Sequence, residues 1–151
     1  MMRIYMDVCC WNRPFDDQMQ VRIHLEAEAV LAIVEDILRD RFQLVHSEVV
    51  ELEIADTPVA ERRKRLQLMI PKHHSFVRCS PRIEKRSLEL ASQGFAGVDA
   101  LHVASAEAGG ADFFLTTDDR LLKTAERCAS DINVEVANPL EWIKKMEENG
   151  T

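Results

Sequence analysis

Short apolar segments recur along the chain, separated by longer segments in which apolar residues return every three or four positions. A run of four to eight apolar or alternating residues is typical of a β-strand. The segment at 113–116 resembles strands that are buried on both faces of a parallel sheet. The predicted strands are residues 3–7, 42–46, 75–79, 113–116 and 133–137.

Helical spacing is clearest in residues 18–41, where Val21, Leu25 and Ala29 recur at intervals of four. Ser47 is predicted to cap a helix after the second strand, because its side-chain oxygen can accept a backbone N–H at a helix start. Further helices are predicted at 59–70, 82–93 and 100–108, from Asp118 or Asp119 onward, and from Pro139 onward.

Strands that alternate with helices require crossover connections, which are right-handed and produce a parallel sheet with helices on both faces. The expected fold class is therefore α/β, a three-layer α/β/α sandwich with a mostly parallel sheet of about five strands. No repeat, low-complexity segment or linker interrupts the pattern. We expect one domain that spans residues 1–151.

The composition, 46% hydrophobic and 30% charged residues, is that of a globular protein. No apolar run approaches the ~20 residues that span a bilayer, and the first residues lack a signal-peptide core, so a cytoplasmic location is expected. The net charge of −7 argues against a protein that coats nucleic acid non-specifically. An enzyme that acts on nucleic acid needs only a local basic strip to bind phosphates, and the candidates are residues 62–65 and the group Arg82, Lys85 and Arg86. The four cysteines lack zinc-site spacing and are expected to be reduced thiols.

Acidic residues stand where functional side chains of a parallel sheet gather. Asp7 ends the first predicted strand, Asp118 follows the 113–116 strand by two residues, and Asp99 comes directly after a glycine turn. Because such side chains meet at the carboxyl ends of the strands, we expect the three acids to lie close together. Their repulsion favours a bound cation, and carboxylate oxygens suit Mg²⁺ or Mn²⁺. A metal-activated water attacking a phosphodiester is the chemistry that fits this arrangement.

Three short motifs resemble those of one known family. Residues 97–106 contain an Asp that opens a helix of small residues, and residues 111–118 form a strand running into Thr-x-Asp. Together they resemble the C-terminal signature of PIN-domain ribonucleases, and residues 4–7 resemble the family's first-strand Asp. The family's second acid usually lies in a Glu-Leu or Glu-Ile pair on the helix after the second strand, which Glu53 matches better than Glu48 or Glu51.

This resemblance implies a five-stranded parallel sheet and a divalent-metal-dependent endoribonuclease that cleaves single-stranded RNA. Asp7, Asp99 and Asp118 would coordinate Mg²⁺ or Mn²⁺, and Glu53 would complete the site as a ligand through water or by orienting the attacking water. Thr116 would donate a hydrogen bond to one carboxylate and so restrict its rotamer.

Some small members of the family are the toxin subunits of toxin–antitoxin pairs and are often dimeric. The resemblance therefore implies an RNA substrate, an antitoxin protein as partner, a homodimer and no membrane. The alternative is a catalytically silent PIN-like domain that binds RNA or protein, against which the retained acids count. A receiver domain would need an Asp after the 75–79 segment and a Lys at the end of the last strand, and the sequence has neither. A haloacid-dehalogenase-type phosphatase would need Asp-x-Asp after the first strand, where this sequence has Asp7-Val8-Cys9.

Several assignments stay open at this point. Asp118 and Asp119 form a doublet, although the Thr-x-Asp spacing favours Asp118 as the inward carboxylate. Taken singly, Asp99 and Asp118 are also well placed to cap helices. His102 is predicted to be a packed helix histidine. The sequence also leaves open whether the site binds one cation or two, and which RNA sequence would be cleaved.

Overall fold

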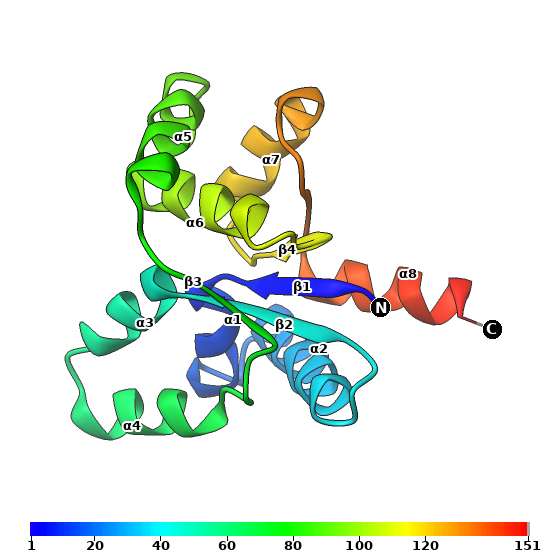
Figure 1. Ribbon diagram of the computed structural model, residues 1–151. Coiled ribbons are helices and arrows are strands. Elements are labelled where there is room, and N and C mark those ends of the chain that lie inside the picture. The colour runs from blue at the N-terminus through cyan, green and yellow to red at the C-terminus, as the bar shows by residue number, and fades with distance from the viewer. Residues whose placement is uncertain (151) are drawn as a thin grey trace.

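A five-stranded parallel sheet lies at the centre of the computed structural model, which describes residues 1–150. The strand order is β3-β2-β1-β4-β5, with β1 in the middle (Figure 1). This arrangement confirms the predicted fold class. The strands are β1 (Arg3–Met6), β2 (Gln43–Ser47), β3 (Ser75–Val77), β4 (Phe113–Leu115) and β5 (Glu135–Ala137).

Helices cover both faces of the sheet: α5, α6 and α7 lie on one side, and α1, α2 and α8 on the other (Figure 1). Among residues 1–150, no helix is both long and apolar enough to cross a membrane. The helices are α1 (Val8–Asn12), η1 (Arg13–Phe15), α2 (Val21–Leu38), α3 (Glu48–Ala55), α4 (Ala60–Met69), α5 (Pro81–Ser92), α6 (Gly97–Ala108), α7 (Asp119–Arg127), η2 (Ala129–Asp131) and α8 (Pro139–Asn149).

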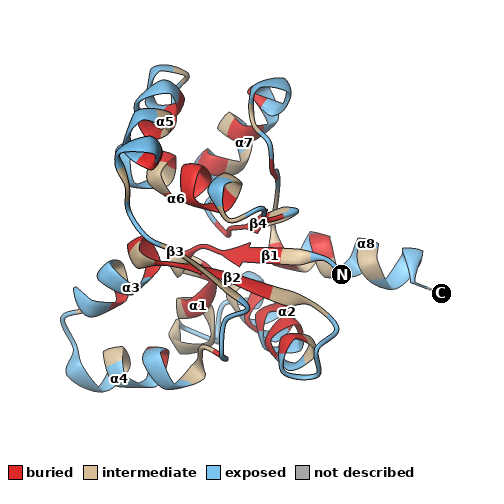
Figure 2. Cartoon of the chain, viewed as in Figure 1, coloured by how far each residue is buried: buried red, intermediate tan, exposed pale blue. Residues whose placement is uncertain are grey.

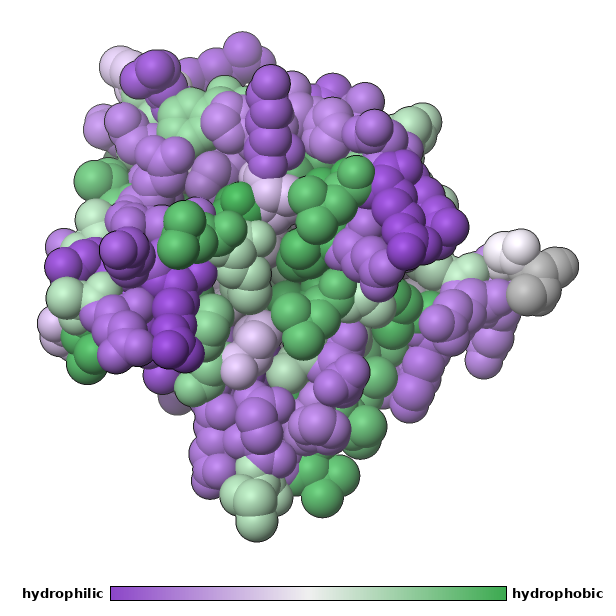
Figure 3. Space-filling model, turned by 90° about the horizontal axis from the view of Figure 1, so that it is seen from below, coloured by the Kyte–Doolittle hydropathy of each residue, from purple (hydrophilic) through white to green (hydrophobic). Residues whose placement is uncertain are grey.

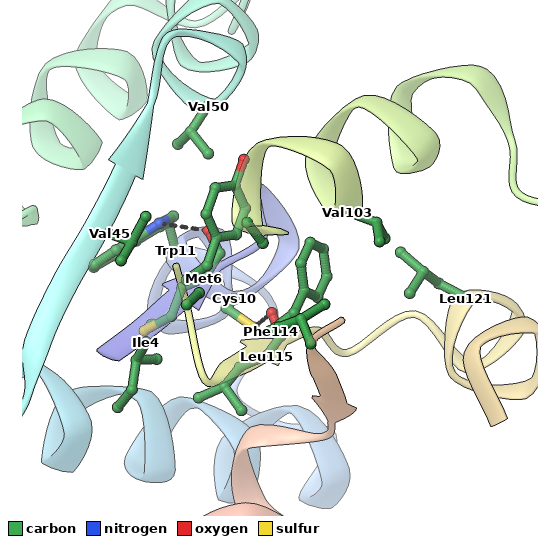
Figure 4. Close-up of a cluster of buried hydrophobic side chains, with 14 of the residues drawn as sticks. Ile4, Met6, Cys10, Trp11, Val45, Val50, Val103, Phe114, Leu115 and Leu121 are labelled. Atoms are coloured by element: carbon green, nitrogen blue, oxygen red, sulfur yellow. Dashed lines mark hydrogen bonds between the residues drawn. The ribbon is translucent and has the colours of Figure 1, made fainter. Parts of the chain in front are cut away.

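The segment directly after Asp7 is helical, although the sequence pattern predicts no helix there. Asp7 caps α1, because its side chain accepts a hydrogen bond from the backbone N–H of Val8. Trp11 is fully buried and its indole N–H donates to the carbonyl oxygen of Met6 at 3.1 Å (Figure 4). The sequence pattern missed this helix because five residues are too few to show a helical period.

The core is built around the two central strands. Ile4, Tyr5 and Met6 of β1, and Phe114 and Leu115 of β4, are at most 1% exposed. Figure 2 shows buried residues concentrated on the sheet and on the helix faces turned toward it. Complete burial of such side chains contributes about 1.5–3 kcal/mol each, so the carboxyl ends of β1 and β4 are held firmly.

The helix α6 packs closely against the sheet at its C-terminal end. A Cβ atom added to Gly109 would lie 2.5 Å from Cγ1 of Val45 on β2, so a larger residue would push the helix away. Gly110 follows with a φ of +69°, a backbone conformation that glycine adopts without strain. The predicted end of this helix at residue 108 is therefore confirmed, and the glycine pair that follows holds the element that carries Asp99 against the sheet.

Candidate active site

The strand order reverses direction at β1, which pairs with β2 on one side and with β4 on the other. Crevices of open parallel sheets form at such a point, outside the carboxyl ends of the strands. Asp7 directly follows β1, and Asp118 comes three residues after the end of β4. The fold therefore brings these two acids to neighbouring positions at one edge of the sheet.

Hydrogen bonds hold the carboxylate of Asp7 in one orientation, and this residue is only 7% exposed. Oδ1 accepts from the N–H of Val8 at 2.8 Å, and Oδ2 accepts from the hydroxyl of Thr116 at 2.8 Å and the thiol of Cys9 at 3.4 Å. The N–H of Asp118 in turn donates to the Thr116 hydroxyl at 3.1 Å. Thr116 thus donates to a carboxylate as predicted and links the two strand ends.

Asp99 lies in the first turn of α6, close to the other acids. Burial, followed by the charges of Asp7 and Asp118, raises the pKa of its carboxyl to about 6. Ala96, not Asp99, is the N-cap of α6, so helix capping does not account for Asp99. The site therefore gathers negative charge at a distance where the carboxylates repel one another.

The structure separates the two residues of the Asp118-Asp119 doublet. Asp118 caps α7, where its side chain accepts from the N–H groups of Arg120 and Leu121, and its charge acts on Asp99. Asp119 is paired with Arg22 at 2.7 Å, and this hydrogen-bonded pair lowers the pKa of the Asp119 carboxyl. Asp118 is thus the member of the doublet that belongs to the acid cluster, while it also caps a helix.

Glu53 and Glu51, both on α3, point to different surroundings. Glu53 is half-buried and contacts Nε2 of His102, and its charge also acts on Asp99. Glu51 lies 3.7 Å from His46 and lines a separate cavity of about 640 Å³. The structure therefore brings Glu53, the residue preferred from the sequence, to the acid cluster and leaves Glu51 outside it.

His102 is buried as predicted, at 1% exposed, but it also takes part in the cluster. Its Nε2 contacts Glu53 and lies 3.6 Å from Oδ1 of Asp7. Its Nδ1 lies 2.6 Å from the Tyr5 hydroxyl, which lies 2.7 Å from the Ser47 hydroxyl. Burial raises the pKa of the Tyr5 phenol well above its usual value, so this hydroxyl keeps its proton. The signal that sequence analysis passed over is the spacing of three residues from Asp99, which places both side chains on one helix face.

One arginine of each predicted basic strip is engaged in ion pairs within the fold. Arg62 contacts Asp16 and donates to the side chain of Asn12, and Arg86 pairs with Glu107 at 2.7 Å. Because these guanidinium groups have protein partners, they stabilise the fold and are less available to a phosphate backbone.

The cluster has the donor groups and the spacing of a cation site. Asp7, Glu53 and His102 each offer one ligand atom, and these atoms all lie within 4.8 Å of one another. The PIN domain family model matches residues 5–127, more than half of the chain. The chain belongs to the PIN-domain family. A comparison of this PIN domain with curated protein sequences finds no match.

Solved structures share the PIN fold at low sequence identity. FitAcB from Neisseria gonorrhoeae is 16% identical, with a TM-score of 0.55, and the match covers 90% of this chain and 97% of that one. VapBC2 from Rickettsia felis, bound to a DNA fragment from its promoter, is 11% identical with a TM-score of 0.58 and coverages of 91% and 98%. FitAB bound to an IR36 DNA fragment is 15% identical with a TM-score of 0.57 and coverages of 91% and 95%. At these identities the likeness shows a common fold.

Proposed function

We propose that this PIN-domain protein is a divalent-metal-dependent endoribonuclease that hydrolyses single-stranded RNA. The observation that carries the proposal is the gathering of acids at one edge of the sheet, where Asp7 and Glu53 offer ligand atoms within 4.8 Å of each other and the charges of Asp7, Asp118 and Glu53 act on the partly buried Asp99. Such crowding costs free energy in the absence of a cation. A silent binding domain would have no need to retain it, and so is the weaker candidate.

The donor set fits Mg²⁺ or Mn²⁺, because hard carboxylate oxygens dominate it. We propose Asp7, Asp99 and Asp118 as ligands, with Glu53 completing the site. A divalent cation held there would supply positive charge that lowers the pKa of a nearby water and offsets charge on the scissile phosphate. The likeness of the fold to the FitAcB and VapBC2 structures supports the choice of a PIN nuclease of the toxin–antitoxin type.

The protein groups have distinct tasks in this scheme. Asp7 is fixed by Thr116 and the N–H of Val8, so it presents one carboxylate geometry throughout the reaction. Glu53 is 36% exposed, and this half-open position suits a group that orients the attacking water. Asp118 is exposed at the start of α7, where an RNA backbone can approach it.

An assay on a mixed pool of single-stranded RNA tests the proposal directly. Incubation with Mg²⁺ or Mn²⁺ is expected to produce cleavage that chelation by EDTA abolishes, because the acids alone repel the phosphate backbone. The same preparation carrying Asp7→Asn is the control for a contaminating nuclease. Intact RNA under every condition, together with retained RNA binding, would instead establish the silent binding domain.

The two glutamates on α3 offer a matched pair of variants. Glu53→Gln is expected to lower metal-dependent cleavage about 10–100-fold, because the lost carboxylate orients ligands in the acid cluster. Glu51→Gln is expected to stay within about twofold of the parent, because Glu51 faces His46 instead. Initial cleavage rates at saturating Mn²⁺ measure both. The reverse order of effects would remove Glu53 from the proposed site.

We also propose an antitoxin protein and a second copy of the chain as partners, and a cytoplasmic site of action. On the face at the bottom of Figure 1, where α2 and α4 lie, apolar side chains gather in patches between polar ones (Figure 3). Val21 and Leu25 on α2 are 74% and 44% exposed, and Val59 and Leu68 near α4 are 60% and 76% exposed. Exposed apolar patches of this kind favour a protein partner over RNA on this face.

A further inference from the structure

His102 stands one helical turn after Asp99 on α6 and is almost completely buried. Residues three apart lie on the same face of a helix, so the imidazole and the Asp99 carboxylate project toward the same region. Nε2 of His102 lies between two carboxylates, in contact with Glu53 and 3.6 Å from Oδ1 of Asp7. A nitrogen donor is therefore present inside a cluster of oxygen donors.

The spacing of these atoms suits direct coordination of one ion. Ligand atoms of Asp7, Glu53 and His102 all lie within 4.8 Å of one another. Metal–ligand bonds to nitrogen and oxygen are about 2.0–2.2 Å long, so ligand atoms on opposite sides of an ion lie roughly 4 Å apart. Asp7 and His102 are buried and held in place, whereas the half-exposed Glu53 has room to adjust.

The second ring nitrogen of His102 has the partner that a metal-binding histidine requires. Such histidines donate the N–H on the other nitrogen to a fixed acceptor, which sets the tautomer. Nδ1 faces the Tyr5 hydroxyl at 2.6 Å, and that hydroxyl faces Ser47 at 2.7 Å. The hydrogen bonds that join His102, Tyr5 and Ser47 can point in two directions. Tyr5 donates to Nδ1 when Nε2 carries the proton, and Nδ1 donates to Tyr5 when the Nε2 lone pair binds a metal ion. In both directions the Tyr5 hydroxyl keeps its partners.

We infer that His102 binds the divalent cation through Nε2 and thereby makes the site favour Mn²⁺ and later first-row ions over Mg²⁺. Imidazole nitrogen suits transition metal ions, whereas Mg²⁺ prefers a shell of oxygens and water. Like the proposed nuclease activity, on which it rests, this role requires a cation beside Asp7 and Glu53. The competing role is a hydrogen bond from His102 that only orients Glu53, in which case no metal–nitrogen bond forms.

Pulsed electron paramagnetic resonance of bound Mn²⁺, recorded without RNA, distinguishes these two roles. The untagged wild-type protein is expected to show modulation from an imidazole ¹⁴N, replaced by a ¹⁵N pattern after labelling with ¹⁵N-histidine. His102→Gln should lose the nitrogen coupling. His46→Gln, which alters another buried histidine outside the cluster, should keep it. Wild-type protein that binds Mn²⁺ without nitrogen coupling overturns the inference, and this outcome does not depend on any variant folding.

Competition between Mn²⁺ and Mg²⁺ for the same proteins gives a second readout. In His102→Gln the amide oxygen replaces a nitrogen donor, so the preference for Mn²⁺ over Mg²⁺ is expected to fall at least about tenfold. An equal loss of affinity for Mn²⁺ and for Mg²⁺ in His102→Gln would overturn the proposed role of His102. Nitrogen coupling in a protein that leaves RNA intact would support His102 as a ligand and contradict the proposed nuclease activity. RNA cleavage without nitrogen coupling would support the nuclease activity and contradict His102 as a ligand.

Discussion

Replacement of Asp99 by asparagine is expected to lower the rate of metal-dependent RNA cleavage at least about 100-fold. The reason is that Asp99→Asn removes one anionic group from the point where Asp7 and Asp118 also act. Loss of a group that stabilises charge in the reaction commonly costs this much. Single-turnover cleavage of a fixed RNA by the variant and the parent, at equal Mn²⁺, measures the effect.

The same substitution is expected to stabilise the protein when no cation is present. Burial, followed by the charges of Asp7 and Asp118, raises the pKa of Asp99 to about 6, above its value of about 4 in an unfolded chain. The ionised carboxylate therefore destabilises the folded state, fully above pH 6 and progressively less as the pH falls toward 4. Solvent screening at this partly buried group reduces the gain from Asp99→Asn to about 1 kcal/mol at pH 7.5.

Thermal melting in EDTA across this pH range tests the stability half of the prediction. Glu126→Gln, which changes an exposed carboxylate on α7, is the control and should melt with the parent. Addition of Mn²⁺ should raise the melting temperature of the parent more than that of Asp99→Asn, because the cation relieves a repulsion that the variant has already lost. A variant that is inactive and also destabilised at pH 7.5 would show that Asp99 is a structural residue.

The sequence was informative where chemistry is tied to a strand end. Asp7 and the Thr-x-Asp segment flank apolar strands, so their positions follow once the strands and their parallel arrangement are predicted. The hydrogen bond from Thr116 to Asp7 follows from the pairing of β1 with β4. Glu53 was predicted from the resemblance to the PIN-domain family, and the structure places it on α3, one turn after the buried Val49 and Val50.

The remaining features depend on contacts between segments far apart in the sequence. The pairing of Asp119 with Arg22 joins residues 97 positions apart, and nothing near Asp119 predicts it. The contact between His102 and Glu53 likewise needs α3 and α6 to be placed beside one another.

Glu26 is the clearest feature without a sequence signal, since it is a charged residue on α2 that is 1% exposed. Its carboxylate accepts hydrogen bonds from Arg13 at 2.8 Å, Arg22 at 3.3 Å and the amide of Asn138 at 2.6 Å. These partners come from η1, from α2 and from the N-cap of α8. Arg22 also forms an ion pair with Asp119 at the start of α7, so the network extends to the residue beside Asp118.

Glu26→Ala is expected to lower the free energy of unfolding by about 3 kcal/mol, because Nε of Arg13 and the side-chain amide of Asn138 lose the buried carboxylate that accepts their hydrogen bonds. Glu28→Ala, two residues along the same helix and 65% exposed, should change it by less than about 0.5 kcal/mol. Urea unfolding in EDTA compares them without a contribution from cation binding. Equal stability of the two variants would mean that water replaces the carboxylate at no cost. If the prediction holds, the edge of the sheet that carries the acid cluster depends on a buried carboxylate that lies outside that cluster.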